Sequence, residues 1–176
     1  EEIPWLVRPH CNDTSGIRVI SRYNVTPATD ESRLFPTLPA KAETYRSIMN
    51  TQPIQKRRVD DDGGSLEVHS IFDTIQGEGP FTGHRAVFVR LAGCNLQCPA
   101  CDTDYTSERL EITPAGIAAT VNHRNDSKPT LVVITGGEPF RQNIYPLVRK
   151  LLDEGHTVQV ETNGTLPPPS VSFSEL

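Results

Sequence analysis

The sequence lacks the features of a membrane or secreted protein. No apolar run approaches the ~20 residues that a membrane-spanning helix needs, and no hydrophobic secretory segment precedes the chain. Only four cysteines occur in 176 residues. The three that lie close together cannot all pair with one another, so a disulfide framework is not expected. These absences predict a soluble, cytoplasmic protein whose thiols stay reduced.

An excess of positive charge is also missing. The chain carries 17 Lys and Arg against 22 Asp and Glu, for a net charge of −5. This balance argues against a broad nucleic-acid-binding face, and no direct nucleic-acid binding is expected. The basic run at residues 56–58 is followed directly by aspartates at residues 60–62 and is interpreted as a solvated linker.

Sustained periodicity is absent from residues 1–65. Six prolines recur there among polar residues, and a short helix is expected only around residues 40–49. The stretch ends in Asp-Asp-Asp-Gly-Gly at residues 60–64, which is a linker or turn signal. We therefore predict a proline-rich N-terminal extension and linker over residues 1–65 and a separate domain over residues 66–176.

From residue 66 onward, apolar strands alternate with helical patterns. Strands are expected over residues 66–72, 86–91, 131–135 and 157–161, and helices over residues 114–123 and 144–153. Continuous apolar strands that alternate with helices indicate an α/β fold with a parallel sheet and right-handed crossovers. In such a fold the loops at the carboxyl ends of the strands carry the chemistry.

Three cysteines follow the strand at residues 86–91. Cys94, Cys98 and Cys101 have the spacing C-x3-C-x2-C. Three thiolates can hold three irons of a four-iron cluster and leave the fourth iron open to a small molecule. Spacing alone leaves two alternatives: structural zinc with a histidine or carboxylate as fourth ligand, or unrelated thiols. Cys11 lies far from this group and is treated as incidental.

A glycine loop follows the strand at residues 131–135. It reads Thr135-Gly136-Gly137-Glu138-Pro139. The two glycines let the backbone come close to a ligand, and Glu138 can accept hydrogen bonds from an ammonium group. Alone, such a loop is usually just a turn. Its position one strand and helix after the cysteines makes it more specific.

The cysteine triplet, this glycine loop and the segment Val-Glu-Thr-Asn-Gly at residues 160–164 together resemble the radical S-adenosylmethionine enzymes. In that family the open iron binds S-adenosylmethionine, and one electron from the reduced cluster cleaves it to methionine and a 5′-deoxyadenosyl radical. A closer resemblance, over residues 68–165, is to the family of 7-carboxy-7-deazaguanine synthases. It is carried by the motifs at residues 72–79, 81–83, 88–96 and 101–103.

This resemblance implies a fold, an activity and partners. The fold is a partial (β/α) barrel of the TIM type, with residues 66–176 supplying its N-terminal half. The activity is a radical lyase that converts 6-carboxy-5,6,7,8-tetrahydropterin to 7-carboxy-7-deazaguanine with release of ammonia, in the biosynthesis of queuosine and other 7-deazapurines. The cofactors are a 4Fe-4S cluster, S-adenosylmethionine and Mg²⁺. The partners are the pterin substrate, a flavodoxin-like or other reductant, and a second copy in a homodimer.

The resemblance also implies roles for individual residues. The implied cluster ligands are Cys94, Cys98 and Cys101, and the implied Mg²⁺ ligand is Thr103. The residues implied to bind S-adenosylmethionine are Ala100, Cys101, Asp102, Gly137 and Glu138. Those implied to bind the substrate are Ile75, Gln76, Gly77, Arg90 and Thr135. No catalytic side chain is expected beyond the cofactor. Glu78 and Glu161 are further candidates for polar contacts.

Arg90 is a charged residue in an otherwise apolar strand. It lies on the same face as Ala86 and Phe88, near the carboxyl end of the strand. A guanidinium group there is costly unless it is paired. The resemblance implies that the carboxylate of the substrate is its bidentate partner. An internal salt bridge to Glu78 or Glu161 is the alternative.

The chain departs from the family at both ends. Members of the family continue through further strands after the position of Gly164, one of which ends in Ser-Pro-Lys, whereas this sequence stops at Leu176. We therefore expect a truncated or split form, or one completed by a partner. A glycyl-radical activase of the same superfamily is a second hypothesis, which the motifs at residues 76–79 and 101–103 disfavour. A non-catalytic metal-binding remnant is a third.

Overall fold

The computed structural model describes residues 17–21 and 50–168, and for residues 17–21 only the backbone. The helix expected over residues 40–49 and the incidental Cys11 lie outside these residues. Within the described residues, no helix is long and apolar enough to cross a membrane.

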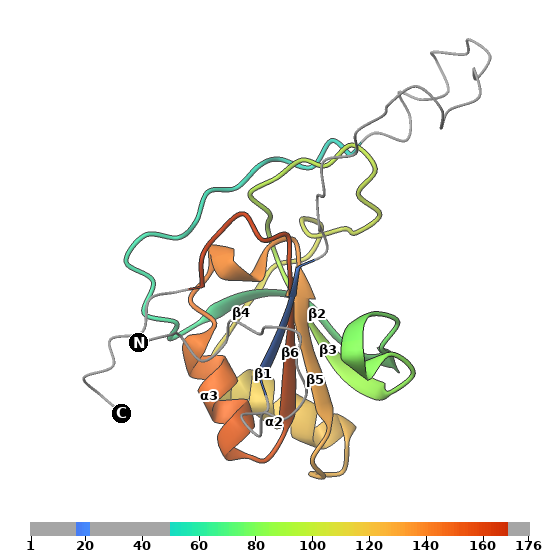
Figure 1. The fold of residues 1–176 in the computed structure, drawn as a ribbon. Helices are drawn as coiled ribbons and strands as arrows, with labels where there is room; N and C mark the ends of the chain where they lie inside the picture. The colour runs from blue at the N-terminus through green and yellow to red at the C-terminus, as the bar shows by residue number, and fades with distance from the viewer. Residues whose placement is uncertain (1–16, 22–49, 169–176) are drawn as a thin grey trace, which may run out of the picture.

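One mixed sheet forms the centre of the described chain (Figure 1). Its strands are β1 (Ile17–Ser21), β2 (Leu66–Ile75), β3 (Arg85–Leu91), β4 (Leu110–Ile112), β5 (Leu131–Gly136) and β6 (Thr157–Thr162). The six strands lie in the order β1-β6-β5-β3-β2-β4. The four strands β1, β6, β5 and β3 are parallel, whereas β2 is antiparallel to both β3 and β4.

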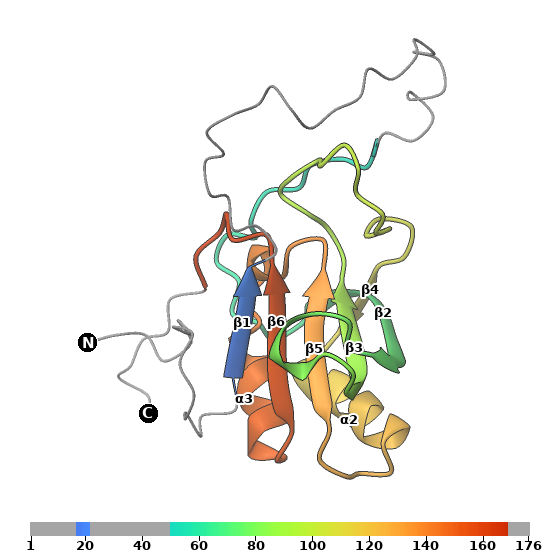
Figure 2. The same cartoon turned by 45° about the vertical axis from the view of Figure 1, so that its right-hand side comes forward.

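Two α-helices cover one face of this sheet. They are α2 (Pro114–Arg124) and α3 (Tyr145–Asp153), and short 3₁₀ helices η1 (Gly79–Phe81) and η2 (Pro139–Arg141) occupy two of the loops. Figure 2 shows the parallel strands side by side with both helices behind them. The helix α2 begins well because Thr113 caps it, accepting a hydrogen bond from the Gly116 N–H at 3.2 Å, and Pro114 suits the first helical position.

Alternate residues of each strand point to opposite faces of the sheet. The helix-facing residues of β3 are Val87, Val89 and Leu91, and they belong to the main hydrophobic core with residues of both helices. The opposite face carries a smaller cluster that includes Ala86 and Phe88. Arg90 continues this second face toward the carboxyl end, as the sequence predicts. The helix-covered face of the sheet therefore packs into the main core, and the opposite face is available to a ligand.

The predicted α/β fold, a partial barrel, is confirmed. The expectation of a parallel sheet is wrong at β2, which pairs antiparallel with β3 because the short connection between them holds no crossover helix. The strands and helices expected from residue 66 onward are all present, with ends that differ by up to three residues. The sequence did not indicate β1 or β4. A five-residue and a three-residue strand carry too little pattern of their own, and they are defined instead by pairing with β6 and β2.

Residues 50–65, inside the predicted linker, lie against the domain. The Gln55 N–H donates to the Cys94 carbonyl at 2.7 Å, and the Arg58 N–H donates to the Arg141 carbonyl at 2.9 Å. The Arg58 guanidinium reaches the side chain of Gln142 at 3.2 Å and the carboxylate of Asp61 at 3.6 Å. The interpretation of the basic run as a solvated linker is therefore wrong at Arg58. The domain boundary at residue 65 stays a prediction.

His156 makes the stability of the fold depend on pH. It is buried between α3 and β6, where its Nδ1 accepts a hydrogen bond from the Thr130 N–H at 3.2 Å. Its Nε2 lies 3.1 Å from the side-chain oxygen of Asn122 and therefore donates to it. Burial lowers the pKa of His156, and the Glu154 carboxylate opposes that shift only in part. The buried ring is thus neutral in the folded protein.

We expect His156 to destabilise the protein at mildly acidic pH. Its contribution to stability is complete above the unfolded-state pKa of about 6.5 and is lost as pH falls toward the lowered folded-state pKa, with a slope of at most about 1.4 kcal/mol per pH unit. Urea unfolding at pH 7.5 and pH 5.5 (about one unit either side of that value) should show a larger loss for the wild type than for His156→Gln. Parallel losses in both proteins would contradict this assignment.

Candidate functional site

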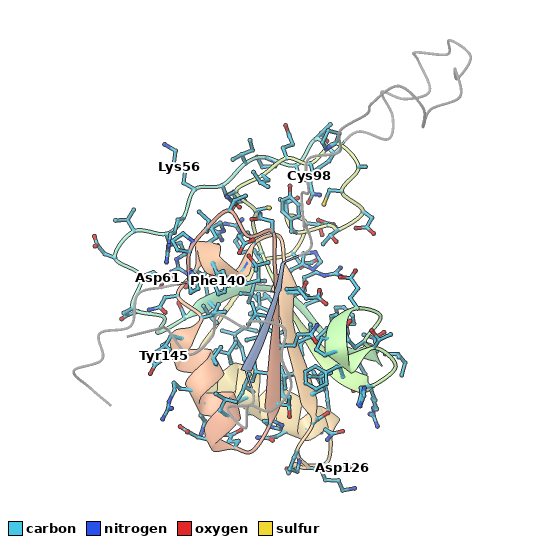
Figure 3. All side chains as sticks on the ribbon, viewed as in Figure 1. Lys56, Asp61, Cys98, Asp126, Phe140 and Tyr145 are labelled. Atoms are coloured by element: carbon cyan, nitrogen blue, oxygen red, sulfur yellow. The ribbon has the colours of Figure 1, made fainter. Side chains whose placement is uncertain are left out.

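A cavity of about 560 Å³ lies at the carboxyl ends of β3, β5 and β6. It is lined by Cys94, Leu96, Cys98, Pro99, Ala100, Cys101, Asp102, Thr103, Tyr105, Thr135, Gly136, Gly137, Glu161, Thr162 and Asn163. In Figure 3, Cys98 lies on the loop beyond these strand ends, opposite Asp126 at the other end of the sheet. Parallel strands bring three loops distant in sequence to one edge, which is where such folds bind ligands.

All three clustered cysteines are free thiols on this cavity. Cys94 is buried, whereas Cys98 and Cys101 are half-buried. Burial raises the pKa of the Cys94 thiol, and the Leu96 N–H, 3.4 Å from its sulfur, opposes that shift by donating a hydrogen bond. The side-chain N–H of Asn163 also lies 3.9 Å from this sulfur. The loops after β3 and β6 therefore meet at Cys94.

The spread of the three thiols around the cavity bears on the choice between a zinc ion and a cluster. A structural zinc ion needs four ligands around one point, with sulfurs about 2.3 Å from the metal. In the described residues, no three His, Cys, Asp or Glu side chains converge in a way that would hold a single metal ion. A four-iron cluster takes one thiolate on each ligated iron, so its cysteines need not converge on one point. Three thiols around an open cavity fit that larger group.

Two glycines let the loop after β5 pack directly against the chain that leads to Cys94. A Cβ atom on Gly137 would overlap the carbonyl group of Gly93, and one on Gly136 would overlap the backbone of Leu91. The close approach allows the Glu138 N–H to donate to the Gly93 carbonyl at 3.0 Å. The sequence suggested that these glycines admit a ligand. At both glycines the structure supplies a further reason, the close contact between two backbones.

Glu138 is completely buried beneath the cavity and does not line it. Its carboxylate accepts hydrogen bonds from the Phe140 N–H at 2.9 Å, the Asn163 N–H at 2.8 Å and the Thr162 hydroxyl at 2.8 Å. Burial raises the pKa of Glu138, and these donors oppose the shift. Glu138 therefore connects the loop after β5 to the end of β6. Its contact with a bound amino group stays a prediction.

We expect Glu138→Ala to destabilise the protein by about 3 kcal/mol, because several buried donors lose their acceptor at once. Glu138→Gln keeps one acceptor oxygen and should fall between Glu138→Ala and the wild type. Chemical denaturation of the three apo proteins measures both effects. A loss below about 1 kcal/mol in Glu138→Ala would mean that water replaces the carboxylate.

A row of polar groups crosses the open face of the sheet beside the cavity. Arg90 on β3 is the register partner of Thr135 on β5. The Thr135 hydroxyl donates to the Glu161 carboxylate at 2.9 Å, and the Gln76 side-chain N–H donates to the same carboxylate at 3.0 Å. Thr135, Glu161 and Gln76 are all buried. The row offers hydrogen-bonding groups of both kinds in a fixed arrangement.

Arg90 ends this row without an ionic partner in the described part of the chain. Its guanidinium carbon lies 5.2 Å from the ring centroid of Phe72, and its Nε is buried with no hydrogen-bond partner. The alternative of an internal salt bridge to Glu78 or Glu161 is therefore not observed. An unpaired buried donor is costly, so the geometry favours a partner that lies outside the described residues.

The predicted site residues divide into two sets. Those that line the cavity are Cys94, Cys98, Ala100, Cys101, Asp102, Thr103, Thr135 and Gly137. Those that do not are Ile75, Gln76, Gly77, Arg90 and Glu138. Of the second set, Gln76 and Arg90 lie on the polar row, while Ile75 and Gly77 are exposed where β2 ends. Roles for all of these residues stay predictions.

Sequence reasoning assigned no role to Tyr105 or Asn163, which also line the cavity. Asn163 carried a signal, since it stands before a glycine at the carboxyl end of a predicted strand. Tyr105 carried none beyond its closeness to the third cysteine. It is almost completely buried, and its hydroxyl donates to the Leu96 carbonyl at 3.3 Å.

Comparison with known proteins gives consistent results. The family model described as "4Fe-4S single cluster domain" matches residues 75–166. The 7-carboxy-7-deazaguanine synthase of Rhodospirillum rubrum is 52% identical over 105 residues, which are 60% of this chain and 45% of that protein. The enzyme of the same name from Rickettsia prowazekii is 51% identical over 109 residues, or 60% of this chain and 47% of its own length.

A solved structure is also similar. The crystal structure of QueE from Escherichia coli matches with a TM-score of 0.55 at 30% sequence identity, covering 61% of this chain and 56% of that chain. This chain thus spans about half the length of the relatives that it matches.

Proposed function

Because this chain belongs to the 4Fe-4S single cluster domain family, we propose that it binds one such cluster and acts as a 7-carboxy-7-deazaguanine synthase of the radical S-adenosylmethionine type. The observation that carries the proposal is the meeting of three free thiols and the polar row at one cavity. The similarity to enzymes named 7-carboxy-7-deazaguanine synthase supports the choice of reaction.

Cys94, Cys98 and Cys101 would hold the cluster, and the fourth iron would face the cavity. The chemistry that such a group supplies when bound is one electron for the cleavage of S-adenosylmethionine and, from it, a radical that abstracts hydrogen. Ala100, Asp102 and Gly137 line the same cavity and would bind the S-adenosylmethionine molecule beside the cluster. Glu138 already accepts hydrogen bonds from Asn163 and Thr162 beneath the cavity. From there it would contact the amino group of the S-adenosylmethionine molecule.

The polar row would bind and orient the pterin. Arg90 would pair with its carboxylate through parallel hydrogen bonds. Thr135, Glu161 and Gln76 would hold the ring edge, whose donors and acceptors match a hydroxyl, a carboxylate and an amide. Thr103 lines the cavity, and its hydroxyl, which donates to the Asp102 carboxylate at 3.2 Å, would contribute one ligand to Mg²⁺, with the remaining oxygens coming from the substrate and water. Orientation of the reacting carbon is then the protein's main contribution.

Further features of the proposal rest on the family resemblance. They are a flavodoxin-like or other electron donor, a homodimer and a cytoplasmic location. Light scattering of the reconstituted protein tests the dimer, and reduction by a purified flavodoxin tests the donor.

Anaerobic reconstitution with iron and sulfide tests the function directly. The holoprotein is incubated with 6-carboxy-5,6,7,8-tetrahydropterin, S-adenosylmethionine, Mg²⁺ and dithionite, and 7-carboxy-7-deazaguanine is measured by mass spectrometry. Product formation is expected. Cleavage of S-adenosylmethionine with no pterin product would contradict the assigned substrate and point to another radical reaction. Failure to take up iron would contradict the cluster itself.

A further inference from the structure

Residues 50–58, which we call the strap, run along the cysteine loop. Figures 1 and 2 both show this segment beside the loop that follows β3. The Asn50 N–H donates to the Pro99 carbonyl at 3.1 Å, and the Gln55 N–H donates to the Cys94 carbonyl at 2.7 Å. Ile54 and Cys94 also form an isolated parallel bridge. The strap therefore contacts the loop at the first cysteine and again between the second and third.

Gln52 makes the largest number of side-chain contacts between the strap and this loop. Its side-chain N–H donates to the Thr103 carbonyl at 2.8 Å. Its side-chain oxygen accepts from the Tyr105 N–H at 2.9 Å and from the Thr106 hydroxyl at 3.0 Å. One amide group thus fixes the backbone on both sides of Asp104, shortly after the third cysteine. The Gln52 carbonyl also accepts from the side chain of Gln97 at 2.8 Å, between the first two cysteines.

The loop needs such contacts because it lacks a hydrogen-bonded frame of its own. Residues 95–105 contain no helix or paired strand. Within this stretch, the backbone bond from the Cys101 N–H to the Cys98 carbonyl, at 3.1 Å, closes a single turn. Tyr105 anchors the end of the loop by burial, and the Asn50 side chain donates to its hydroxyl at 3.2 Å. The loop also has contacts of its own, from the Tyr105 hydroxyl to the Leu96 carbonyl and from the Cys101 thiol to the Thr103 carbonyl at 3.7 Å, and the strap adds to these from outside the loop.

The strap is itself fixed at its far end. Arg58 donates its backbone N–H to the carbonyl of Arg141 in η2 at 2.9 Å, and the Arg141 guanidinium reaches the Lys56 carbonyl at 3.5 Å. Arg141 is buried and forms an ion pair with Glu67 on β2. The strap thus connects the cysteine loop to η2, which follows the glycine loop on the other side of the cavity.

We propose that Gln52 is a positioning residue of the cysteine site, which holds the segment after Cys101 so that the three thiols are correctly placed before any cluster binds. The proposal rests on the proposed function only in naming a cluster as the group that the thiols receive. A site whose ligands are ordered in advance loses less conformational entropy on binding. Residues outside the ligand set that orient ligands in this way have measurable effects on metal sites.

The test compares apo proteins carrying Gln52→Met, Gln52→Glu and the control Thr51→Val. Met keeps the size of Gln52 without its hydrogen bonds, whereas Glu keeps the acceptor for Tyr105 and Thr106 and loses the donor to Thr103. Thr51 is the adjacent residue and is exposed. Hydrogen exchange at the Tyr105 amide and the alkylation rate of Cys101 by iodoacetamide are measured by mass spectrometry under native conditions.

In Gln52→Met we expect exchange at the Tyr105 amide to rise by about tenfold, since all three side-chain hydrogen bonds of Gln52 are lost, including the acceptor of that amide. Cys101 should be alkylated several times faster, while protection in the sheet and in α2 and α3 is unchanged. Gln52→Glu should fall between Met and the wild type, and Thr51→Val should match the wild type. Unchanged exchange and alkylation in Gln52→Met would overturn the proposal.

Two further measurements keep the test decisive. If Gln52→Met does not fold, hydrogen exchange at the Tyr105 amide of the wild type is the test. A protected amide there supports the proposal, and an unprotected one would overturn it. After anaerobic reconstitution, Gln52→Met should show a broader electron paramagnetic resonance spectrum of the reduced cluster than Thr51→Val, and an identical spectrum would count against it. A wild type that shows the expected apo protection but takes up no iron would refute the proposed function while supporting the role of Gln52 in the loop.

Discussion

Replacement of Cys98 by alanine is expected to abolish cluster binding while leaving the fold intact. Reconstituted wild type should contain about four irons per chain, and Cys98→Ala should contain little iron and lack the brown colour. A cluster held by three thiolates has no spare ligand, and in the described residues no fourth cysteine lies near it. Loss of one thiolate therefore removes a third of the protein's bonds to the cluster.

Cys98 is the best of the three cysteines for this experiment. Its thiol is half-buried on the loop, whereas the Cys94 thiol is buried and accepts a hydrogen bond from the backbone of Leu96, and the Cys101 thiol donates to the Thr103 carbonyl at 3.7 Å. Substitution at Cys98 should therefore change the unfolding free energy of the apo protein by no more than about 0.5 kcal/mol. Loss of iron could then not be explained by loss of structure.

Cys11→Ala is the matched control, because it removes the remaining cysteine of the chain. It should reconstitute like the wild type. Full iron content in Cys98→Ala would contradict the assignment of this thiol as a ligand. A colourless wild type that binds one zinc ion would contradict the cluster.

The elements that could be predicted from the sequence are those defined by their own residues. The core of β3 reads Ala-Val-Phe-Val at residues 86–89, and β5 reads Leu-Val-Val-Ile at residues 131–134, so burial on both faces is evident from composition alone. The cysteine spacing likewise indicated a metal site, which the family resemblance identified as iron–sulfur, and its position after β3 placed it at the correct edge of the sheet. Arg90 was noticeable because a charge interrupts the apolar pattern.

The strap could not be predicted, because it has no periodicity to detect. Its contacts are backbone hydrogen bonds to a loop and the side-chain amides of Asn50 and Gln52, and neither kind leaves an apolar pattern. Pro53 and the charges at residues 56–58 instead resemble a linker. The hydrogen bonds that Glu138 accepts from Thr162 and Asn163 were not predictable for a related reason, since they form only once β5 and β6 lie side by side.

Replacement of Arg90 by methionine is expected to weaken binding of the carboxylated pterin by about 100-fold, while the cluster is retained. The guanidinium of Arg90 has no ionic partner in the described residues, and removal of one side of a buried charge pair typically costs about 2–5 kcal/mol in binding. The unfolding free energy should stay within about 1 kcal/mol of the wild type. Removal of the unpaired Nε and loss of the contact with Phe72 have opposite effects on stability.

Binding of a pterin that lacks the carboxylate shows whether Arg90 recognises the charge of the substrate or only maintains the shape of its binding site. The wild type should bind this analogue about 100-fold more weakly than the carboxylated pterin, whereas Arg90→Met should bind the two equally, because the pair is already broken in the variant. Arg85→Met is the control on the same strand, since Arg85 is exposed at the opposite end of β3 and pairs with Asp73. It should retain full affinity. Normal binding by Arg90→Met, or equal losses for both pterins, would show that Arg90 does not recognise the carboxylate.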